Sequence, residues 1–262
     1  MKLLPFDTDL SGMDCHIHSR FSPDARHAGA GAPDEIAAAV RARGLRGFII
    51  TDHVDIGHWR DFEPINFDEY FDTWEKTRKK NPDLTIYIGL EVGFEPERAQ
   101  ETARLIKDLP LEYVINSVHY WKGPNAENAN DHFSLGRQKS YAAYLEAISA
   151  SLDAPYDFST VGHLGFAERY SPYLSPDREI DYRSFKRILD EIADKAVKRR
   201  VRFEENTNSG GEIRSPRADF LRVYKDKGGV RPVLGSDAHT SASIGQHFDK
   251  AKAVLDDIFG KE

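Results

Sequence analysis

The residues best suited to chemistry are histidines and acids placed where strands would end. Six of the ten histidines follow short apolar, β-branched runs, together with one glutamate and one aspartate. These eight residues are His16, His18, His53, Glu91, His119, His163, Asp237 and His239. A single histidine at a strand end is usually structural, but coincidence does not explain eight such positions. We therefore expect a metal centre built from imidazole and carboxylate groups, which suit zinc, iron or manganese.

These residues need a scaffold that brings the strand ends together. Seven apolar runs alternate with amphipathic helical stretches, and this rhythm favours parallel strands joined by helical crossovers. The runs cover 13–18, 47–52, 85–91, 113–118, 158–162, 201–206 and 232–237. The helices are expected over 33–44, 70–79, 97–107, 141–152, 182–200, 216–228 and 245–259.

A closed barrel explains the polar strand ends better than an open sheet. An open sheet would spread seven strand ends over ~30 Å, whereas a barrel collects its C-terminal strand ends on one rim. We therefore predict an α/β fold with a seven-stranded (β/α)7 barrel, a distorted relative of the TIM barrel. The metal site is expected at the C-terminal strand ends.

Alternation along the first strand predicts which side chains share a face. It places Asp14, His16 and His18 on one face, and Cys15 with Ile17 on the opposite face. Two imidazoles would then lie side by side, and the thiol would take no part. The Asp-x-His sequence after the last strand can bring a carboxylate and an imidazole together in the same way.

The number of ligands predicts more than one ion. Eight or nine ligands exceed what one ion takes, so two or three divalent ions (Zn, Fe or Mn) sharing a carboxylate are implied. Clustered ions activate water and neutralise a phosphoryl group. Gly-x-Ser-x-Gly and P-loop motifs are absent from the sequence. The remaining histidines, His27, His58, His132 and His247, are expected to be surface residues.

Composition narrows the class of protein further. The net charge of −7 argues against a nucleic-acid partner. The apolar runs are too short for a membrane span. One cysteine and a poor match to a signal peptide predict a cytoplasmic protein.

The order of the motifs resembles that of the polymerase and histidinol phosphatase (PHP) superfamily, over about residues 13–247. The matching motifs are Asp14-Cys-His16-Ile-His18, Thr51-Asp-His53, Glu91, Ser117-Val-His119, Gly162-His163 and Gly235-Ser-Asp237-Ala-His239. Three further sequence motifs resemble those of the histidinol-phosphatase branch of this superfamily. They are Gly89-Leu-Glu91-Val-Gly93-Phe, Gly162-His-Leu164 followed by Arg169-Tyr170, and Glu205-Asn206-Thr207.

The resemblance implies a single domain of this type over residues 1–262 and a trinuclear site. By motif, the first metal would be held by His16, His18, Glu91 and Asp237, the second by Asp24, His53 and His239, and the third by Glu91, His119 and His163. Asp24 rests on the resemblance alone, since Ser22-Pro23-Asp24 is typical of a turn. The implied reaction is attack of a metal-bridging hydroxide on L-histidinol phosphate, a small-molecule phosphate ester. Glu91, Asp237, His239 and Arg169 would be the catalytic residues.

Two arginines are candidates for binding the substrate phosphate. Arg169 follows His163 by six positions and can fork two N–H donors onto phosphate oxygens; the alternative is a surface arginine paired with Glu168 or Asp177. Arg214 is the weaker candidate.

The segments 206–214 and 122–139 depart from the branch pattern and flank the rim. This leaves open another PHP-type phosphoesterase acting on a nucleotide or other small phosphate ester. A non-catalytic domain is disfavoured because every ligand position is filled. An amidohydrolase is disfavoured because no lysine ends the fourth strand.

Overall fold

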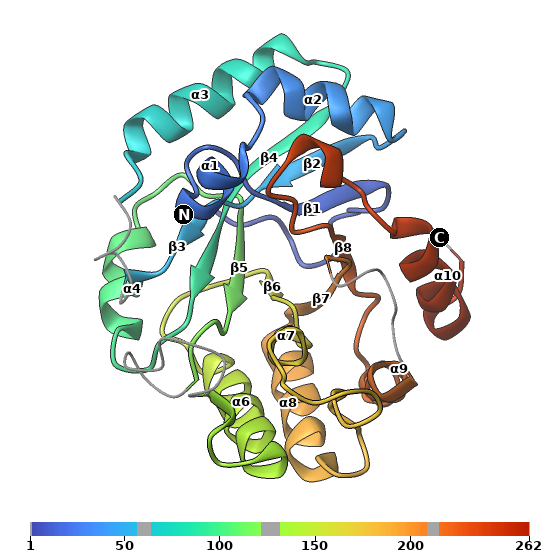
Figure 1. Ribbon diagram of the computed structural model, residues 1–262. Coiled ribbons are helices and arrows are strands. Elements are labelled where there is room, and N and C mark those ends of the chain that lie inside the picture. The colour runs from blue at the N-terminus through green and yellow to red at the C-terminus, as the bar shows by residue number, and fades with distance from the viewer. Residues whose placement is uncertain (1, 57–63, 122–131, 209–214, 262) are drawn as a thin grey trace.

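A barrel of parallel strands forms the centre of the molecule (Figure 1). The structure, a computed structural model, describes residues 2–56, 64–121, 132–208 and 215–261. In sheet order the strands are β1 (Met13–Ile17), β2 (Gly47–Ile50), β4 (Thr85–Gly93), β5 (Tyr113–Ser117), β6 (Thr160–Val161), β7 (Arg202–Asn206) and β8 (Val233–Gly235). The short β3 (His53–Val54) follows β2 and also pairs with β4.

The ring of strands closes between its first and last members. Ile17 and Ala238 form a parallel bridge, and the N–H of His18 donates to the carbonyl of Ala238 at 2.9 Å. The N–H of Asp237 donates to the carbonyl of His16 at 2.8 Å. The predicted seven-stranded barrel is therefore confirmed, and its closure lies beside the predicted metal ligands.

Helices surround the strands, as Figure 1 shows. They are α1 (Pro23–Ala28), α2 (Pro33–Ala42), α3 (Phe67–Lys80), α4 (Ala99–Ile106), α6 (Arg137–Ser151), α7 (Phe166–Arg169), α8 (Lys186–Arg199), α9 (Ser215–Asp226), the 3-10 turn η2 (Ser241–Ser243) and α10 (Phe248–Phe259). Each helix expected from the sequence is present within a few residues of its predicted bounds. No helix in the described ranges is long and apolar enough to cross a membrane.

The turn expected at Ser22-Pro23-Asp24 is wrong, because Pro23 begins the short helix α1. A Ser-Pro pair is compatible with either outcome, since proline's fixed φ also suits the first position of a helix. Asp24 therefore lies in the first turn of α1, which is the next element after β1.

Alternation along the strands divides the core into two layers. Phe48 and Ile50 pack outward with the helices, whereas Ile49 belongs to a smaller cluster inside the barrel. Cys15 lies in the inner cluster and Ile17 in the outer one, so the prediction that they share a face is wrong. The cause is a shift in register between Asp14 and Ile17, which adds a residue to β1 and breaks the alternation.

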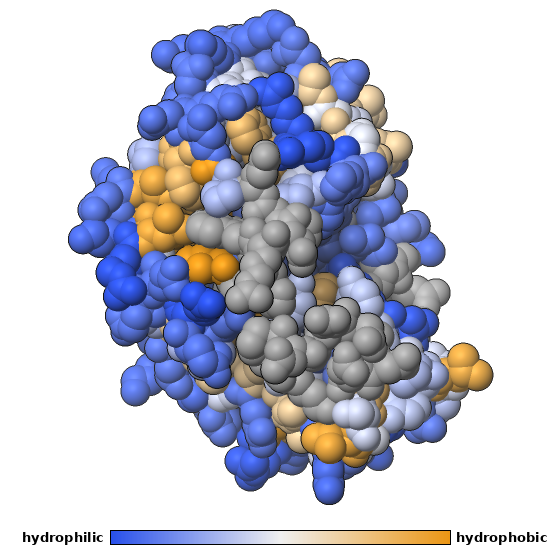
Figure 2. Space-filling view, turned by 60° about the vertical axis from the view of Figure 1, so that its left-hand side comes forward, coloured by the Kyte–Doolittle hydropathy of each residue, from blue (hydrophilic) through white to orange (hydrophobic). Residues whose placement is uncertain are grey.

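The surface seen in Figure 2 is mostly hydrophilic, with separate hydrophobic patches. Large exposed apolar side chains in the described ranges include Leu135, Tyr170 and Leu174. Tyr170 follows α7 directly. Because α7 comes shortly after the C-terminal end of β6, Tyr170 lies near the rim of the barrel where the site is predicted.

Candidate metal centre

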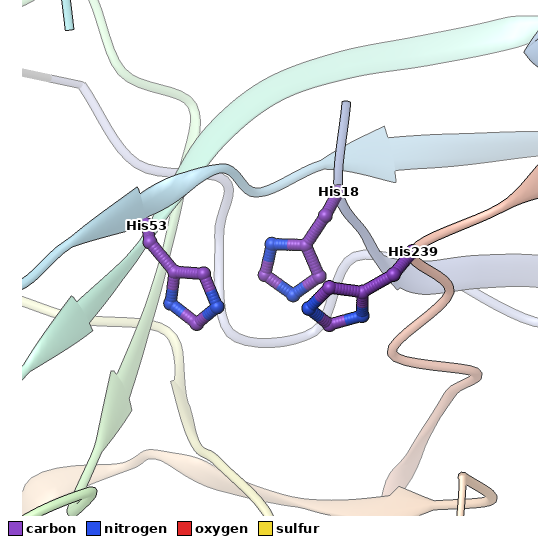
Figure 3. Close-up of side chains that lie close together, drawn as sticks. All are labelled: His18, His53 and His239. Carbon is purple, nitrogen blue, oxygen red and sulfur yellow. The ribbon is translucent and has the colours of Figure 1, made fainter. Parts of the chain in front are cut away.

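The predicted ligands from the strand ends come together on the C-terminal side of the barrel. Figure 3 shows the rings of His18, His53 and His239 pointing toward one another from three different segments. The ring centroid of His18 is 4.3 Å from that of His53 and 4.3 Å from that of His239. Segments more than 180 residues apart in the chain thus converge at one point, as the barrel geometry predicts.

The first group contains His16, His18, Glu91 and Asp237. The Nε2 atoms of His16 and His18 are 3.0 Å apart. Oδ1 of Asp237 lies 3.1 Å from Nε2 of His18, and Oε2 of Glu91 lies 3.1 Å from Nε2 of His16. Two ligands at ~2.0–2.1 Å from one tetrahedral ion would be roughly 3.3 Å apart. These separations therefore fit donors arranged around a single small cation.

Glu91 contacts a second set of imidazoles with its other oxygen. Oε1 is 2.8 Å from Nε2 of His163 and 3.1 Å from Nε2 of His119, and those two nitrogens are 3.3 Å apart. The hydroxyl of Ser117 donates to the same oxygen at 2.6 Å. The two oxygens of the fully buried Glu91 thus face different histidines, which is the arrangement of a shared carboxylate: Oε1 faces His119 and His163, and Oε2 faces His16, His18 and His53.

Asp24 completes the group that it forms with His53 and His239, near the surface. Its Oδ2 lies 2.9 Å from Nε2 of His239 and 3.3 Å from Nε2 of His53. The side chain of Asp24 is 47% exposed and that of His239 is 25% exposed, whereas Glu91 is fully buried. The centre therefore runs from the barrel interior to an open end at Asp24.

The Nδ1 atoms of three imidazoles are held by groups behind the centre. Nδ1 of His16 lies 2.7 Å from Oε1 of Glu204, and Nδ1 of His119 lies 2.8 Å from Oδ1 of Asp55. A carboxylate oxygen only accepts, so in the neutral rings the proton is on Nδ1 and the lone pair is on Nε2. Carboxylates behind metal-binding histidines fix the tautomer and the orientation of the ring in this way.

A hydroxyl does the same for His18. Ser22 donates its hydroxyl to Asp52 at 2.7 Å, so it can only accept from Nδ1 of His18, which is 3.1 Å away. Burial lowers the pKa of His18 to about 3, and the positive charge of His53 acts in the same direction. His18 is therefore neutral, with the lone pair of Nε2 facing Oδ1 of Asp237.

The donor set fits divalent metal ions on these grounds. Lone pairs of imidazole and carboxylate face one another at about 3 Å in a buried space, which is repulsive unless a cation lies between them. Oε2 of Glu91 is buried and has no hydrogen bond with any described residue, although Nε2 of His16 and Nδ1 of His53 are each 3.1 Å away. Nitrogen and oxygen donors without thiolate suit zinc, iron and manganese.

Protons take the place of cations where metal is absent. Burial lowers the pKa of His119, but the carboxylates of Asp55 and Glu91 outweigh burial and raise the pKa to about 10. The pKa of Glu91 is held well below its usual range by His16, His53 and His119, again against the effect of burial. The metal-free centre therefore favours positive charge around Glu91.

Arg169 lies beside the centre and not on the surface. Its Nη1 donates to Oδ2 of Asp237 at 2.9 Å, and its Nη2 donates to Oδ1 of Asn206. Arg169 thus pairs with Asp237 of the centre, whereas the alternative considered from the sequence was a surface pairing with Glu168 or Asp177. Burial opposes the charge of Arg169, but Asp237 outweighs it and raises the pKa of the guanidinium. Arg214 lies outside the described residues.

The backbone of Asp237 is held in an uncommon conformation. Its φ is +51°, in the left-handed region that few residues other than glycine adopt. The amide of Asn208 donates to Oδ2 at 3.2 Å, and that of Asn206 at 3.3 Å. Strained residues of this kind are retained where surrounding contacts outweigh the cost, commonly at functional sites.

Aromatic side chains cover one flank of the centre. The ring of Phe166 stacks on His163 with centroids 4.7 Å apart, and Tyr170 packs on Phe166 at 4.9 Å. His132 is buried and stacks on Trp121 at 3.9 Å, so the prediction that it is a surface residue is wrong. The stacking on Trp121, 11 positions earlier in the chain, contributes to that burial.

Sequence reasoning missed the groups behind the ligands. Glu204 precedes Asn206 by two positions on one strand, so alternation was an available signal that both face the centre. Asp55 follows His53 by two positions, which was the same signal. Nothing local in the sequence indicated that Ser22 would connect Asp52 with His18.

The chain belongs to the PHP domain family, whose model matches residues 14–208. It is 28% identical over 250 residues to the histidinol-phosphatase of Lactococcus lactis, covering 93% of this chain and 90% of that protein. It is 26% identical over 241 residues to a protein of Clostridium acetobutylicum named as a probable histidinol-phosphatase, covering 91% of this chain and 90% of the relative.

Two solved structures are similar throughout. One is histidinol phosphate phosphatase from Lactococcus lactis complexed with zinc, L-histidinol and phosphate, with a TM-score of 0.82, 25% identity, and coverage of 95% of this chain and 94% of that one. The other, from Listeria monocytogenes, has a TM-score of 0.73 at 19% identity, with coverage of 90% and 98%, and shows the same fold.

Proposed function

We propose that this protein is a metal-dependent phosphomonoesterase that hydrolyses L-histidinol phosphate to L-histidinol and phosphate. The observation that carries the proposal is a buried carboxylate, Glu91, whose two oxygens face two separate sets of imidazoles. The similar structure that binds zinc, L-histidinol and phosphate supports the same substrate class. The metal dependence is inferred from the imidazole and carboxylate donors of the site. The choice of a phosphate ester as substrate is inferred from the relatives.

The ligand groups support two to three divalent ions, of zinc, iron or manganese. The first would be held by His16, His18, Glu91 and Asp237, the second by Asp24, His53 and His239, and the third by Glu91, His119 and His163. When bound, such ions supply Lewis acidity that neutralises phosphoryl charge and activates water for attack. Glu91 would keep two of the ligand groups at a fixed separation, because its side chain is rigidly buried.

The substrate would approach from the exposed end of the centre. Asp24 is 47% exposed and His239 is 25% exposed, and Tyr170 stands nearby with half of its surface in solvent. The N–H at Nδ1 of His239 donates to the carbonyl of Asp237 at 2.9 Å, which aims Nε2 at this open end. His239 and Asp237 are therefore placed to fix the geometry at which the ester meets the centre.

Arg169 would bind the phosphate. Asp237 and Asn206 hold its guanidinium beside the first ligand group, and a guanidinium can direct further N–H donors onto the oxygens of a phosphate. The positive charge is retained at all ordinary pH values. On one flank, Phe166 and Tyr170 would limit the access of water.

One domain over residues 1–262 would carry this function. The family model ends at residue 208, but β8, Asp237, His239 and α10 complete the same barrel.

The decisive experiment is a phosphate-release assay with purified, metal-replete protein. L-Histidinol phosphate would be compared with nucleoside monophosphates, phosphotyrosine and a phosphodiester. We expect L-histidinol phosphate to have the highest kcat/KM by at least tenfold. A higher value for another ester would replace histidinol phosphate as the substrate and leave the phosphatase chemistry in place. No release from any ester by the metal-replete protein would refute the proposed activity.

A further inference from the structure

Glu204 lies behind the metal centre, on β7, and contacts two of its histidines at once. Oε1 is 2.7 Å from Nδ1 of His16, and Oε2 accepts the backbone N–H of His163 at 2.8 Å. The side chains of Glu204 and His16 are both fully buried. His16 and His163 belong to different ligand groups, so this one carboxylate touches both sides of the centre.

The first contact decides which nitrogen of His16 faces the centre. Because the carboxylate oxygen accepts, the proton of the neutral ring is on Nδ1, and Nε2 offers its lone pair toward His18 and Glu91. The opposite tautomer would place an N–H where the first group needs a donor atom. Glu204 therefore selects the form of His16 that can bind a metal.

The second contact fixes the chain at His163. The strand that precedes it, β6, contains only two residues, so few ladder hydrogen bonds hold its end. Nδ1 of His163 is buried and has no hydrogen-bond partner among the described residues. The carbonyl of His163 accepts from the hydroxyl of Tyr144 at 3.1 Å and from the N–H of Phe166 at 2.8 Å. The bond from the N–H of His163 to Glu204 holds the other side of this peptide backbone, so Glu204 is one of the contacts that place the imidazole against Glu91.

The surroundings hold Glu204 in this one position. The amide of Asn206 donates to Oε1 at 3.0 Å. On the adjacent strand β8, a Cβ at Gly235 would lie 2.0 Å from Oε1 and 2.7 Å from Cβ of His16. Only glycine at this position leaves room for the carboxylate and the imidazole to meet.

We propose that Glu204 is a positioning residue that couples two ligand groups of the metal centre. It sets the tautomer of His16 and the location of His163, and Gly235 makes room for both. Asp55 differs, since its contacts are with the rings of His119 and His53 and not with a ligand's backbone. The inference rests on the proposed function only in that the centre binds divalent metal.

The test uses Glu204→Gln with zinc alone as the probe. An amide can accept at one oxygen only, so its NH2 group must face either the N–H of His16 or that of His163. We expect zinc affinity, measured by competition with a chromophoric chelator, to fall roughly 10- to 100-fold for at least two ions. If the NH2 group faces His16, long-range 1H–15N spectra of the metal-free protein at high pH should show His16 changing tautomer; if it faces the backbone N–H of His163, the tautomer of His16 is kept and the amide resonance of His163 should shift instead.

A matched control separates this role from a general structural one. Glu112→Gln also alters a carboxylate that accepts a backbone N–H, that of Ile88 at 2.9 Å. Glu112 directly precedes β5, so it lies at the N-terminal ends of the strands, away from the metal centre. This variant should retain wild-type zinc affinity whatever its melting temperature. Gly235→Ala should weaken zinc binding as Glu204→Gln does, although no ligand or charge has changed.

Three results would overturn the proposal. They are wild-type zinc affinity in Glu204→Gln, a loss confined to one ion, and an equal loss in Glu112→Gln. If Glu204→Gln does not fold, judged by circular dichroism, Glu204→Asp carries the same test, because it keeps the charge and shortens the reach by one methylene. Zinc affinity is measured without substrate. The result therefore remains valid even if the protein does not hydrolyse histidinol phosphate.

Discussion

Replacing Arg169 by alanine tests how the phosphate is held. The substitution removes a guanidinium whose Nη1 is 2.9 Å from Oδ2 of Asp237. A hydrogen bond to a charged group contributes about 1.5–3 kcal/mol, which corresponds to a loss in kcat/KM of roughly 10- to 100-fold. Arg169→Lys should recover only part of this loss, since an ammonium cannot reproduce the planar fork.

The effect on metal content should be small. Without Arg169, Oδ2 of Asp237 still receives the amides of Asn208 at 3.2 Å and Asn206 at 3.3 Å. The carboxylate therefore stays in place, and elemental analysis should show wild-type metal occupancy. The loss of activity would then reflect substrate handling and not loss of the centre.

Arg137→Ala is the matched control. Its side chain is 22% exposed, close to the 18% of Arg169, and it also braces neighbouring chain segments, by donating to the carbonyls of Asp177 and Glu179. Steady-state phosphate release should be unchanged in this variant, even if its melting temperature falls. If Arg169→Ala keeps kcat/KM within twofold of wild type, the phosphate is held by other groups and the reasoning fails.

Four further predictions concern the metals and the metal-free centre. Elemental analysis of protein purified without chelator should approach three ions per chain; a constant single ion in fully active protein contradicts three ligand groups. Glu91→Gln should lose at least one ion and at least ~10²-fold in turnover, and near-normal turnover would remove Glu91 from the mechanism. The raised pKa of His119, about 10 in metal-free protein, implies that zinc uptake near pH 8 releases its proton, which calorimetry in buffers of different ionisation enthalpy can count. Since the folded pKa lies above the usual 6.5, the imidazolium should stabilise metal-free protein fully below about pH 6.5, and chemical denaturation should show that stability being lost toward pH 10.

The barrel and most of the residues that gather at the candidate metal centre could be predicted because both depend on local periodicity. Apolar runs of alternating character predict strands, and His53, Glu91, His119 and His163 follow such runs. Once the strands are parallel and the ring is closed, their C-terminal ends must meet, whatever the side chains do elsewhere. Asp24 lacked this signal, because it lies on a short helix after β1 and was expected only from the resemblance.

Contacts between distant segments decided the rest. The register shift in β1 placed Cys15 in the inner core, and a strand pattern does not reveal where a bulge falls. Arg169 reaches Asp237 across 68 positions and Glu204 reaches His16 across 188, and no local pattern encodes either pair. The sequence by itself therefore determined which residue types collect at the rim. Only the closed barrel decided which of them touch, because hydrogen-bond partners are chosen by distance in space and not by distance along the chain.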